Sequence, residues 1–209
     1  LGETVINGIG QGYIQTTPLQ LCLMTAQIAN GGFKIKPHII YDEKINYKEI
    51  KKQISKNQKK ENLIYQDFLS DLEIKPYQKM YKNSNNIKFI LDAMFGSTNE
   101  KYGTSFKSRF KDMKYQFAGK TGTSQVKKIT EKDRELDLDI SQIEYKNRDH
   151  ALFIAFAPYK DPRYSLSIII EHGGSGSKAA APIAKKLIKK TIDRHNLRDD
   201  IRNGSTNLV

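Results

Sequence analysis

The sequence predicts an α/β protein of the α+β type, with helices packed on an antiparallel sheet. Three observations predict this class: a well-capped helix near the start, a strand hairpin in the last third, and an amphipathic helix behind that hairpin. With 209 residues, of which 38% are hydrophobic, the chain is long enough to bury a core within one domain. No run approaches the roughly 20 apolar residues that a membrane-spanning helix requires.

The first predicted helix follows the glycine-rich stretch GIGQGY. Thr17 is a suitable N-cap, Pro18 occupies the first helical position, and Gln20 completes a capping box. A glycine pair at 31–32 ends the helix, and FKIKPHII then predicts a short extended segment. Helical spacing predicts that the buried face consists of Leu21, Met24 and Ile28.

The middle of the chain contains one clear helix between polar segments. Residues 41–86 are rich in Lys, Asn and Asp, and we expect a variable surface excursion with one short helix near NLIYQDFLSDL. The stretch NIKFILDAMFG predicts a better helix, and the glycine-rich turn YGTSF follows it. We expect residues 127–149 to form a charged loop between strands. The apolar side of the helix is predicted to consist of Ile87, Ile90, Leu91 and Met94.

The last third predicts two strands and a helix. HALFIAFAP and YSLSIIIEHGG, joined by the turn YKDPR, indicate an antiparallel hairpin. We expect His150 and His172, at the strand ends, to make structural hydrogen bonds. Residues 181–195 indicate an amphipathic helix, and residues 196–209 are expected to form a disordered tail. The inward face of that helix is predicted to consist of Ile183, Leu187, Ile188 and Thr191.

The charge is strongly basic, with 35 Lys and Arg against 23 Asp and Glu, a net charge of +12. Such an excess can indicate nucleic acid or another anionic partner. Here the excess consists mostly of Lys residues spread over the chain, without aromatic residues between them. This pattern favours compositional drift as the origin of the charge, and no nucleic-acid partner is expected. A nucleic-acid binder stays an alternative, with an affinity that falls steeply with salt. The single Cys22 and four scattered histidines show no metal-ligand spacing, so no metal or cofactor is expected.

The stretch FAGKTGTSQV, residues 117–126, is the main candidate for chemistry. Its Gly-Lys-Thr could end a phosphate-binding loop, and its Lys-Thr-Gly could be the third signature of a serine acyl-transfer enzyme. A phosphate-binding loop requires a glycine five positions before Gly119, and that position is Lys114. GIGQGY has Tyr13 where a dinucleotide-binding loop requires its last glycine. Nucleotide binding is therefore disfavoured, and the Lys-Thr-Gly interpretation remains.

Several separated segments support that interpretation: GIGQGYIQTTPLQL, ANGG with KPH, AGKTGTSQV, RDHALFIAFAP, DPRYSLSIIIEHGG and AAPIAKKLI. In this order they resemble the penicillin-binding protein 2 family, the peptidoglycan D,D-transpeptidases of Gram-negative cell-wall elongation. The resemblance implies that residues 1–209 are the C-terminal part of one transpeptidase domain. Its penicillin-binding-protein and serine β-lactamase-like fold is a five-stranded antiparallel sheet flanked by helices. The third strand would carry the Lys-Thr-Gly motif, and 151–171 would form the last two.

The same resemblance implies roles for four residues. In the family, S-x-x-K, S-x-N or S-x-D, and K-T-G meet in one cleft. Lys120 would place a positive charge near the nucleophile and attract the substrate carboxylate. Thr121, Gly122 and Thr123 would bind substrate with it, and the Thr123 hydroxyl would contact the carboxylate. Lys120 would be catalytic through its positive charge. Thr123 would be catalytic because its backbone N–H would be one of two oxyanion donors.

The nucleophilic serine and the general-base lysine are expected outside this chain, so the fragment alone is expected to be inactive. The family's first two motifs precede GIGQG, whereas the literal matches in this chain all follow it. Those for S-x-x-K begin at Ser108, Ser124 and Ser175, and those for S-x-N begin at Ser84, Ser97 and Ser205.

The resemblance also implies partners and a location. The partners would be peptidoglycan stem peptides, β-lactams, a glycan-polymerising membrane protein and an elongation-complex scaffold. The location would be the periplasmic face of the inner membrane, with an anchoring N-terminal helix outside this chain. Two alternatives of the same fold stay open: a serine β-lactamase and a non-catalytic penicillin-binding or sensor module. The TPLQL and EHGG segments favour the transpeptidase.

Overall fold

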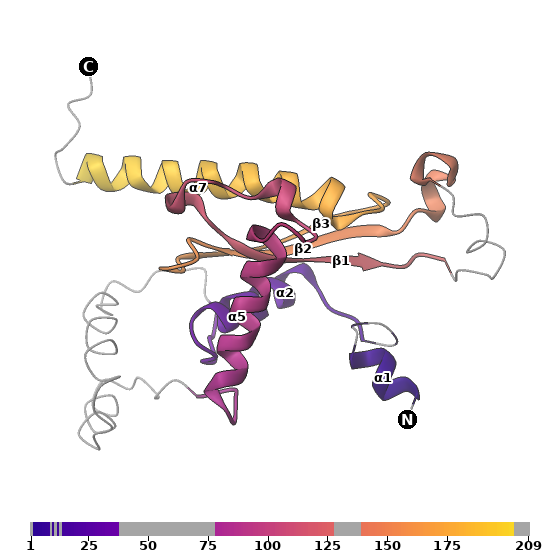
Figure 1. Ribbon diagram of the computed structural model, residues 1–209, viewed down its shortest axis with the longest axis horizontal. Helices are drawn as coiled ribbons and strands as arrows, with labels where there is room; N and C mark the ends of the chain where they lie inside the picture. The colour runs from indigo at the N-terminus through magenta and orange to yellow at the C-terminus, as the bar shows by residue number, and fades with distance from the viewer. Residues whose placement is uncertain are drawn as a thin grey trace.

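An antiparallel sheet in the order β1-β2-β3 lies between helices on both of its faces (Figure 1). The computed structural model describes residues 2–8, 10, 12, 14–37, 78–127 and 139–202. The strands are β1 (Ala118–Ser124), β2 (His150–Ala157) and β3 (Tyr164–Ile170). The α-helices are α1 (Gly2–Gly8), α2 (Pro18–Ala29), α5 (Ser84–Asn99) and α7 (Ala181–Arg202).

Short helical turns connect these elements. The 3₁₀ turns are η1 (Phe106–Ser108), η2 (Met113–Tyr115), η3 (Ile140–Gln142) and η4 (Tyr145–Asn147), and the π-helical turn η5 (Gly176–Ala180) leads into α7. The charged loop predicted at 127–149 therefore contains two 3₁₀ turns in its described part. Among the helices of the described ranges, none combines the length and apolar character needed to cross a membrane.

The mixed helix and strand architecture confirms the predicted fold class, and the 150–170 hairpin is present as β2 and β3. Lys120 pairs in register with Ile154 of β2, and Ile154 pairs with Ser167 of β3. Of the five strands that the resemblance implied, the described residues contain three. The predicted segment at 33–40 contributes, within its described part, one bridge between Phe33 and Lys79.

The two faces of the sheet bury separate cores. Odd-numbered residues of β2, among them Phe153 and Ala155, face α7 together with Phe117. Even-numbered residues such as Phe156 pack with Ala118 of β1 and with Met94 of α5. The alternation follows from the pleat of a strand, which directs successive side chains to opposite faces.

Helix α7 faces the sheet with small residues rather than with the larger ones that were predicted. Ile183 and Leu187 are 39% and 47% exposed, and Thr191 is also exposed, so these three predictions were wrong; Ile188 is buried as predicted. The sheet-facing residues are Ala181, Ala184, Ile188 and Ile192. Phenylalanine rings already fill this face of the sheet, so alanines allow the helix to approach. The helix also continues to Arg202, which corrects the tail predicted to begin at residue 196.

Helix α2 begins as predicted, and its buried face differs by one residue. The Thr17 hydroxyl accepts from the Gln20 N–H at 3.2 Å, and the Gln20 side chain accepts from the Thr17 N–H at 2.8 Å. Met24 is 41% exposed, whereas Thr25 is fully buried. The prediction for Met24 was therefore wrong. Thr25 tolerates burial because its hydroxyl donates to the Leu21 carbonyl at 2.8 Å.

Helix α5 is longer than the periodicity indicated. It begins at Ser84, where the Asn83 side chain caps it by accepting from the Asn85 N–H, so the predicted excursion ends before residue 86. Met94 is buried as predicted, whereas Ile90 is 37% exposed, so the prediction for Ile90 was wrong. The rest of the excursion, including the short helix near 62–72, falls mostly outside the described residues.

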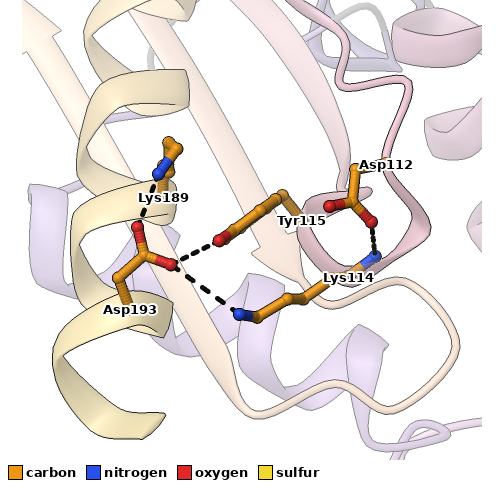
Figure 2. A network of polar contacts seen from close by, with 5 residues as sticks. All are labelled: Asp112, Lys114, Tyr115, Lys189 and Asp193. Atoms are coloured by element: carbon orange, nitrogen blue, oxygen red, sulfur yellow. Dashed lines mark hydrogen bonds and ion pairs between the residues drawn. The ribbon is translucent and has the colours of Figure 1, made fainter. Parts of the chain in front are cut away.

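A polar cluster ties α7 to the η2 turn (Figure 2). The Asp193 carboxylate accepts from the Tyr115 hydroxyl and from Lys189 Nζ at 2.6 Å, and it lies 3.9 Å from Lys114 Nζ. Asp112 holds the turn by accepting from the Lys114 N–H at 2.9 Å. The hydrogen bond from Lys189, and next that from Tyr115, lowers the pKa of the Asp193 carboxyl below its ordinary value. The cluster therefore favours the charged form of Asp193.

We expect Asp193→Asn to lower the melting temperature by about 2 °C at pH 7. A carboxyl with a lowered pKa stabilises the fold above its unfolded pKa, and this contribution is lost as pH falls through the folded pKa. The difference from the unsubstituted protein should therefore shrink below about pH 4. Differential scanning fluorimetry across pH measures it. Asp200→Asn, on an exposed position of the same helix, is the matched control; an equal effect of both variants contradicts the prediction.

Candidate active site

The Lys-Thr-Gly-Thr motif lies on β1, an edge strand in the described part of the sheet. The Gln116 carbonyl accepts from the Tyr159 N–H at 2.8 Å, on the side of β2. The Phe117 carbonyl points the other way and accepts from Asn99 Nδ2 of α5 at 2.8 Å. Because backbone groups alternate along an antiparallel strand, residues 119, 121 and 123 direct their N–H and C=O groups to the outer edge.

Helix α5 closes the first part of this edge. The hydroxyl of Thr98, which is fully buried, lies 3.5 Å from the Gly119 carbonyl and 3.4 Å from the Met94 carbonyl of its own helix. Side chains of α5 therefore occupy the outward carbonyls of residues 117 and 119. The outer edge opens only from residue 120 onward, where the motif begins.

The Lys120 side chain is exposed at the start of the open edge. Its Nζ donates to the Thr121 carbonyl at 2.8 Å and lies 3.5 Å from the Thr121 hydroxyl. Within the described ranges, no carboxylate forms an ion pair with it. The positive charge is therefore held beside the open edge of β1, where an anionic group can reach it.

The Thr121 hydroxyl continues into a row of hydroxyl groups. It lies 3.4 Å from the Thr104 hydroxyl, in the turn after α5, and that hydroxyl lies 3.2 Å from the Ser97 hydroxyl. This row links the motif to the C-terminal end of α5. The sequence interpretation treated 102–106 only as a glycine-rich turn and missed Thr104.

Gly122 lies against the η5 turn that leads into α7. A Cβ placed on Gly176, in the η5 turn, would lie 2.3 Å from the Leu152 carbonyl and 2.8 Å from the Gly122 carbonyl. Real Cβ atoms do not approach backbone oxygens so closely, so only glycine allows this contact. The turn thereby packs directly against the backbone of the motif, and this contact fixes the position of β1.

The far end of β1 is held by Asp149. Its carboxylate accepts from the Val126 N–H at 3.1 Å, and its backbone carbonyl accepts from the Gly174 N–H at 2.8 Å. Thr123 is exposed between these bonds and the start of the motif. The Val126 N–H has the parity of residues 120, 122 and 124, which face β2, so the bond to Asp149 lies on the β2 side of the strand, and the open part of the outer edge ends where β1 itself ends, at Ser124.

The two strand-end histidines bond to neighbouring backbone and to each other, which confirms the predicted structural role. The His172 N–H donates to His150 Nδ1 at 3.0 Å. His172 Nδ1 lies 3.0 Å from the Arg148 carbonyl, and because a carbonyl only accepts, this nitrogen carries the hydrogen. The Tyr145 ring packs on His172 with centroids 4.9 Å apart. The cluster stabilises the corner beside the end of β1.

The short literal matches to the first two motifs fall in unrelated places. Ser108 is 4% exposed in the η1 turn, and Ser84 begins α5. The Ser175 hydroxyl lies 3.0 Å from the Ser177 hydroxyl, and Ser205 lies outside the described residues. The match beginning at Ser124 starts on the last residue of β1, after the motif, and the match beginning at Ser97 lies beside that strand, through Thr104.

Comparisons with known proteins agree with this arrangement. Residues 2–189 match the family of penicillin-binding protein transpeptidase domains. The peptidoglycan D,D-transpeptidase MrdA of Salmonella typhimurium is 31% identical over 192 residues, which are 92% of this chain and 27% of that protein. The chain therefore belongs to the penicillin-binding protein transpeptidase family. It spans about a quarter of the length of that relative.

Solved structures of penicillin-binding protein 2 share the fold. The complex of the Helicobacter pylori protein with MreC aligns with a TM-score of 0.64 and 27% identity, covering 92% of this chain and 28% of that one. The Pseudomonas aeruginosa protein in complex with WCK 5153 aligns with a TM-score of 0.60 and 29% identity, covering 90% of this chain and 33% of that one.

We expect Gly176→Ala to lower the melting temperature by several degrees, because overpacking of this kind costs about 1–3 kcal/mol. The added methyl would displace η5 from β1. Gly8→Ala is the control, because a Cβ there meets no atom within 4 Å. Scanning calorimetry of both variants measures the difference; a Gly176→Ala protein as stable as the Gly8→Ala protein would show that the approach is not constraining.

Proposed function

We propose that this chain forms the Lys-Thr-Gly wall of the cleft in a peptidoglycan D,D-transpeptidase. The observation that supports it most is the pairing of an exposed Lys120 with an open strand edge that α5 closes just before the motif. An extended peptide can add to such an edge as a strand, through main-chain hydrogen bonds. A stem peptide ending in D-Ala-D-Ala has both an extended backbone and a terminal carboxylate.

Each motif residue has a proposed role in binding this substrate. The Lys120 ammonium attracts the terminal carboxylate, and the Thr123 hydroxyl donates a hydrogen bond to it. The outward N–H and C=O groups of Thr121 and Thr123 pair with the substrate backbone. Gly122 leaves the strand without a side chain where the acyl group approaches. These side chains would orient the scissile bond before any covalent step.

The proposed reaction needs a serine and a lysine from a part of the protein outside these 209 residues. The serine oxygen attacks the carbonyl of the D-Ala-D-Ala bond while the lysine takes its proton. The C–N bond then breaks and terminal D-Ala leaves with that proton. The amine of a second stem peptide attacks the acyl-enzyme carbonyl, the serine ester bond breaks as the cross-linking amide forms, and the proton of the amine returns to the serine oxygen through the lysine. The Thr123 N–H would be one oxyanion donor, and Lys120 would favour the neutral form of the lysine base.

The proposal extends to partners and location. The Helicobacter pylori relative was solved in complex with MreC, which supports an elongation-complex scaffold as a partner here. A glycan-polymerising membrane protein would supply the strands to be cross-linked. Both partners fit an enzyme at the periplasmic face of the inner membrane, held there by an N-terminal helix outside this chain.

Fluorescent penicillin should label the full-length protein, because β-lactams mimic D-Ala-D-Ala. We expect Lys120→Ala to slow acylation by about 100-fold or more, in line with the loss of one electrostatic contact to a transition state. Stopped-flow or gel-based labelling measures the rate. Lys88→Ala, on an exposed position of α5, is the control and should label like the unsubstituted protein.

The same labelling separates the alternatives. A transpeptidase keeps its penicilloyl group for many minutes, whereas a β-lactamase turns over a chromogenic cephalosporin. A non-catalytic relative with a degenerate serine motif would not be labelled. Labelling that is insensitive to Lys120→Ala would remove Lys120 from the proposed mechanism.

A further inference from the structure

Three hydroxyl groups lie in a row beside the Lys120 ammonium. An ammonium only donates hydrogen bonds, so the Thr121 hydroxyl accepts from Lys120, and its own hydrogen is left to donate. The Thr104 hydroxyl lies 3.4 Å from the Thr121 hydroxyl and 3.2 Å from the Ser97 hydroxyl, and in each pair either oxygen can be the donor. Because a hydroxyl that accepts from an ammonium is a better donor, the charge of Lys120 favours the order in which Thr121 donates to Thr104 and Thr104 donates to Ser97.

The turn that carries Thr104 is anchored to α5. The Gly103 N–H donates to the Glu100 carbonyl at 2.9 Å, and the Ser105 N–H donates to the Ser97 carbonyl at 2.9 Å. A Cβ on Gly103 would lie 2.4 Å from the Gly96 carbonyl, so the turn lies directly on the helix end. Ser105 is 1% exposed, while Thr104 beside it is exposed. The fold thus presents the Thr104 hydroxyl to β1 from an anchored support.

We propose that Thr104, supported by Ser97, is a positioning residue for the Lys120–Thr121 pair. This inference rests on the proposed function. The Thr104 hydroxyl holds the Thr121 side chain in the rotamer that accepts from the Lys120 ammonium. Lys120 is thereby kept along the outer edge of β1, where the substrate carboxylate arrives. Without the Thr104 hydroxyl, the Thr121 hydroxyl loses its acceptor and the ammonium loses one defined contact.

The contacts in the row are long for hydrogen bonds, at 3.2–3.5 Å. Hydrogen bonds of catalytic groups are often long in unliganded proteins and shorten when the substrate binds. We therefore expect the loss of a hydroxyl from this row to affect the rate of acylation more than it affects the stability of the protein. The contribution should be that of one hydrogen bond, not that of a whole catalytic group.

The test is acylation of the full-length protein by fluorescent penicillin. We expect Thr104→Val, which keeps the shape and removes the hydroxyl, to lower the second-order rate constant about five- to tenfold. Thr104→Ser restores a hydroxyl and should stay within about twofold of the unsubstituted protein. Thr191→Val, at an exposed position of α7, is the matched control and should have no effect. Melting temperatures of all three variants are measured in parallel.

A second pair of variants tests the order of the row. Ser97→Ala should lower the rate less than Thr104→Val, because it lies one step further from Lys120. The double variant should be no slower than Thr104→Val, since both act through the same hydroxyl. If the rate losses of the two single variants multiply in the double variant, the serial arrangement is wrong.

The outcomes separate this inference from the proposed function. An unsubstituted protein that takes no label refutes the proposed function, and the inference fails with it. If that protein is labelled while Thr104→Val matches Thr191→Val, the inference alone is wrong. It is also wrong if Thr104→Ser is as slow as Thr104→Val, or if the rate falls only in variants that melt at lower temperature.

Discussion

The hydrogen bonds from α5 to the outer edge of β1 are the constraint on which the rest of the site depends. Asn99 and Thr98 take the outward carbonyls of residues 117 and 119, so the edge is closed before the motif starts. The strand itself ends at Ser124, directly after the motif. Between these points the backbone faces outward with Lys120 beside it, which makes a strand of the sheet available for binding.

The second requirement is that β1 does not move relative to the sheet. On the face opposite α5, alanines of α7 pack against the aromatic rings, and Gly176 lies against the Gly122 backbone. The cluster around Asp193 ties the same helix to the turn that leads into β1 (Figure 2). Support from both faces keeps the outward groups of the edge in one arrangement, which is the preorganisation that electrostatic stabilisation of a reaction needs.

Much of the fold could be predicted because its signals are local. The Thr17 capping box and the hairpin of β2 and β3 follow from short patterns that the structure confirms. The buried faces of α2 and α7 were partly wrong, since amphipathic spacing identifies the largest apolar residues and not those that fit the sheet. Thr25 and Ala184 are buried in place of Met24 and Leu187.

The motif could be found from the sequence, and its surroundings could not. Lys120 belongs to a recognisable tripeptide with flanking segments in a family order. Thr98, Asn99 and Thr104 act through contacts with residues that lie between 17 and 21 positions further along the chain. A polar residue at a helix end ordinarily indicates a cap or a solvated position, so no local pattern marks these residues as partners of β1.

The length of the open edge limits how many residues of a peptide can pair with it. From residue 121 to the end of β1 at residue 124 a strand advances only about 10 Å, at roughly 3.3 Å per residue. A guest chain can align no more than a few residues there, between α5 at one end and the end of β1 at Ser124 at the other. Such an edge favours the terminus of a peptide over the interior of a long chain. Selectivity for chain ends would then come from the length of free backbone as well as from the charge that meets the terminal carboxylate.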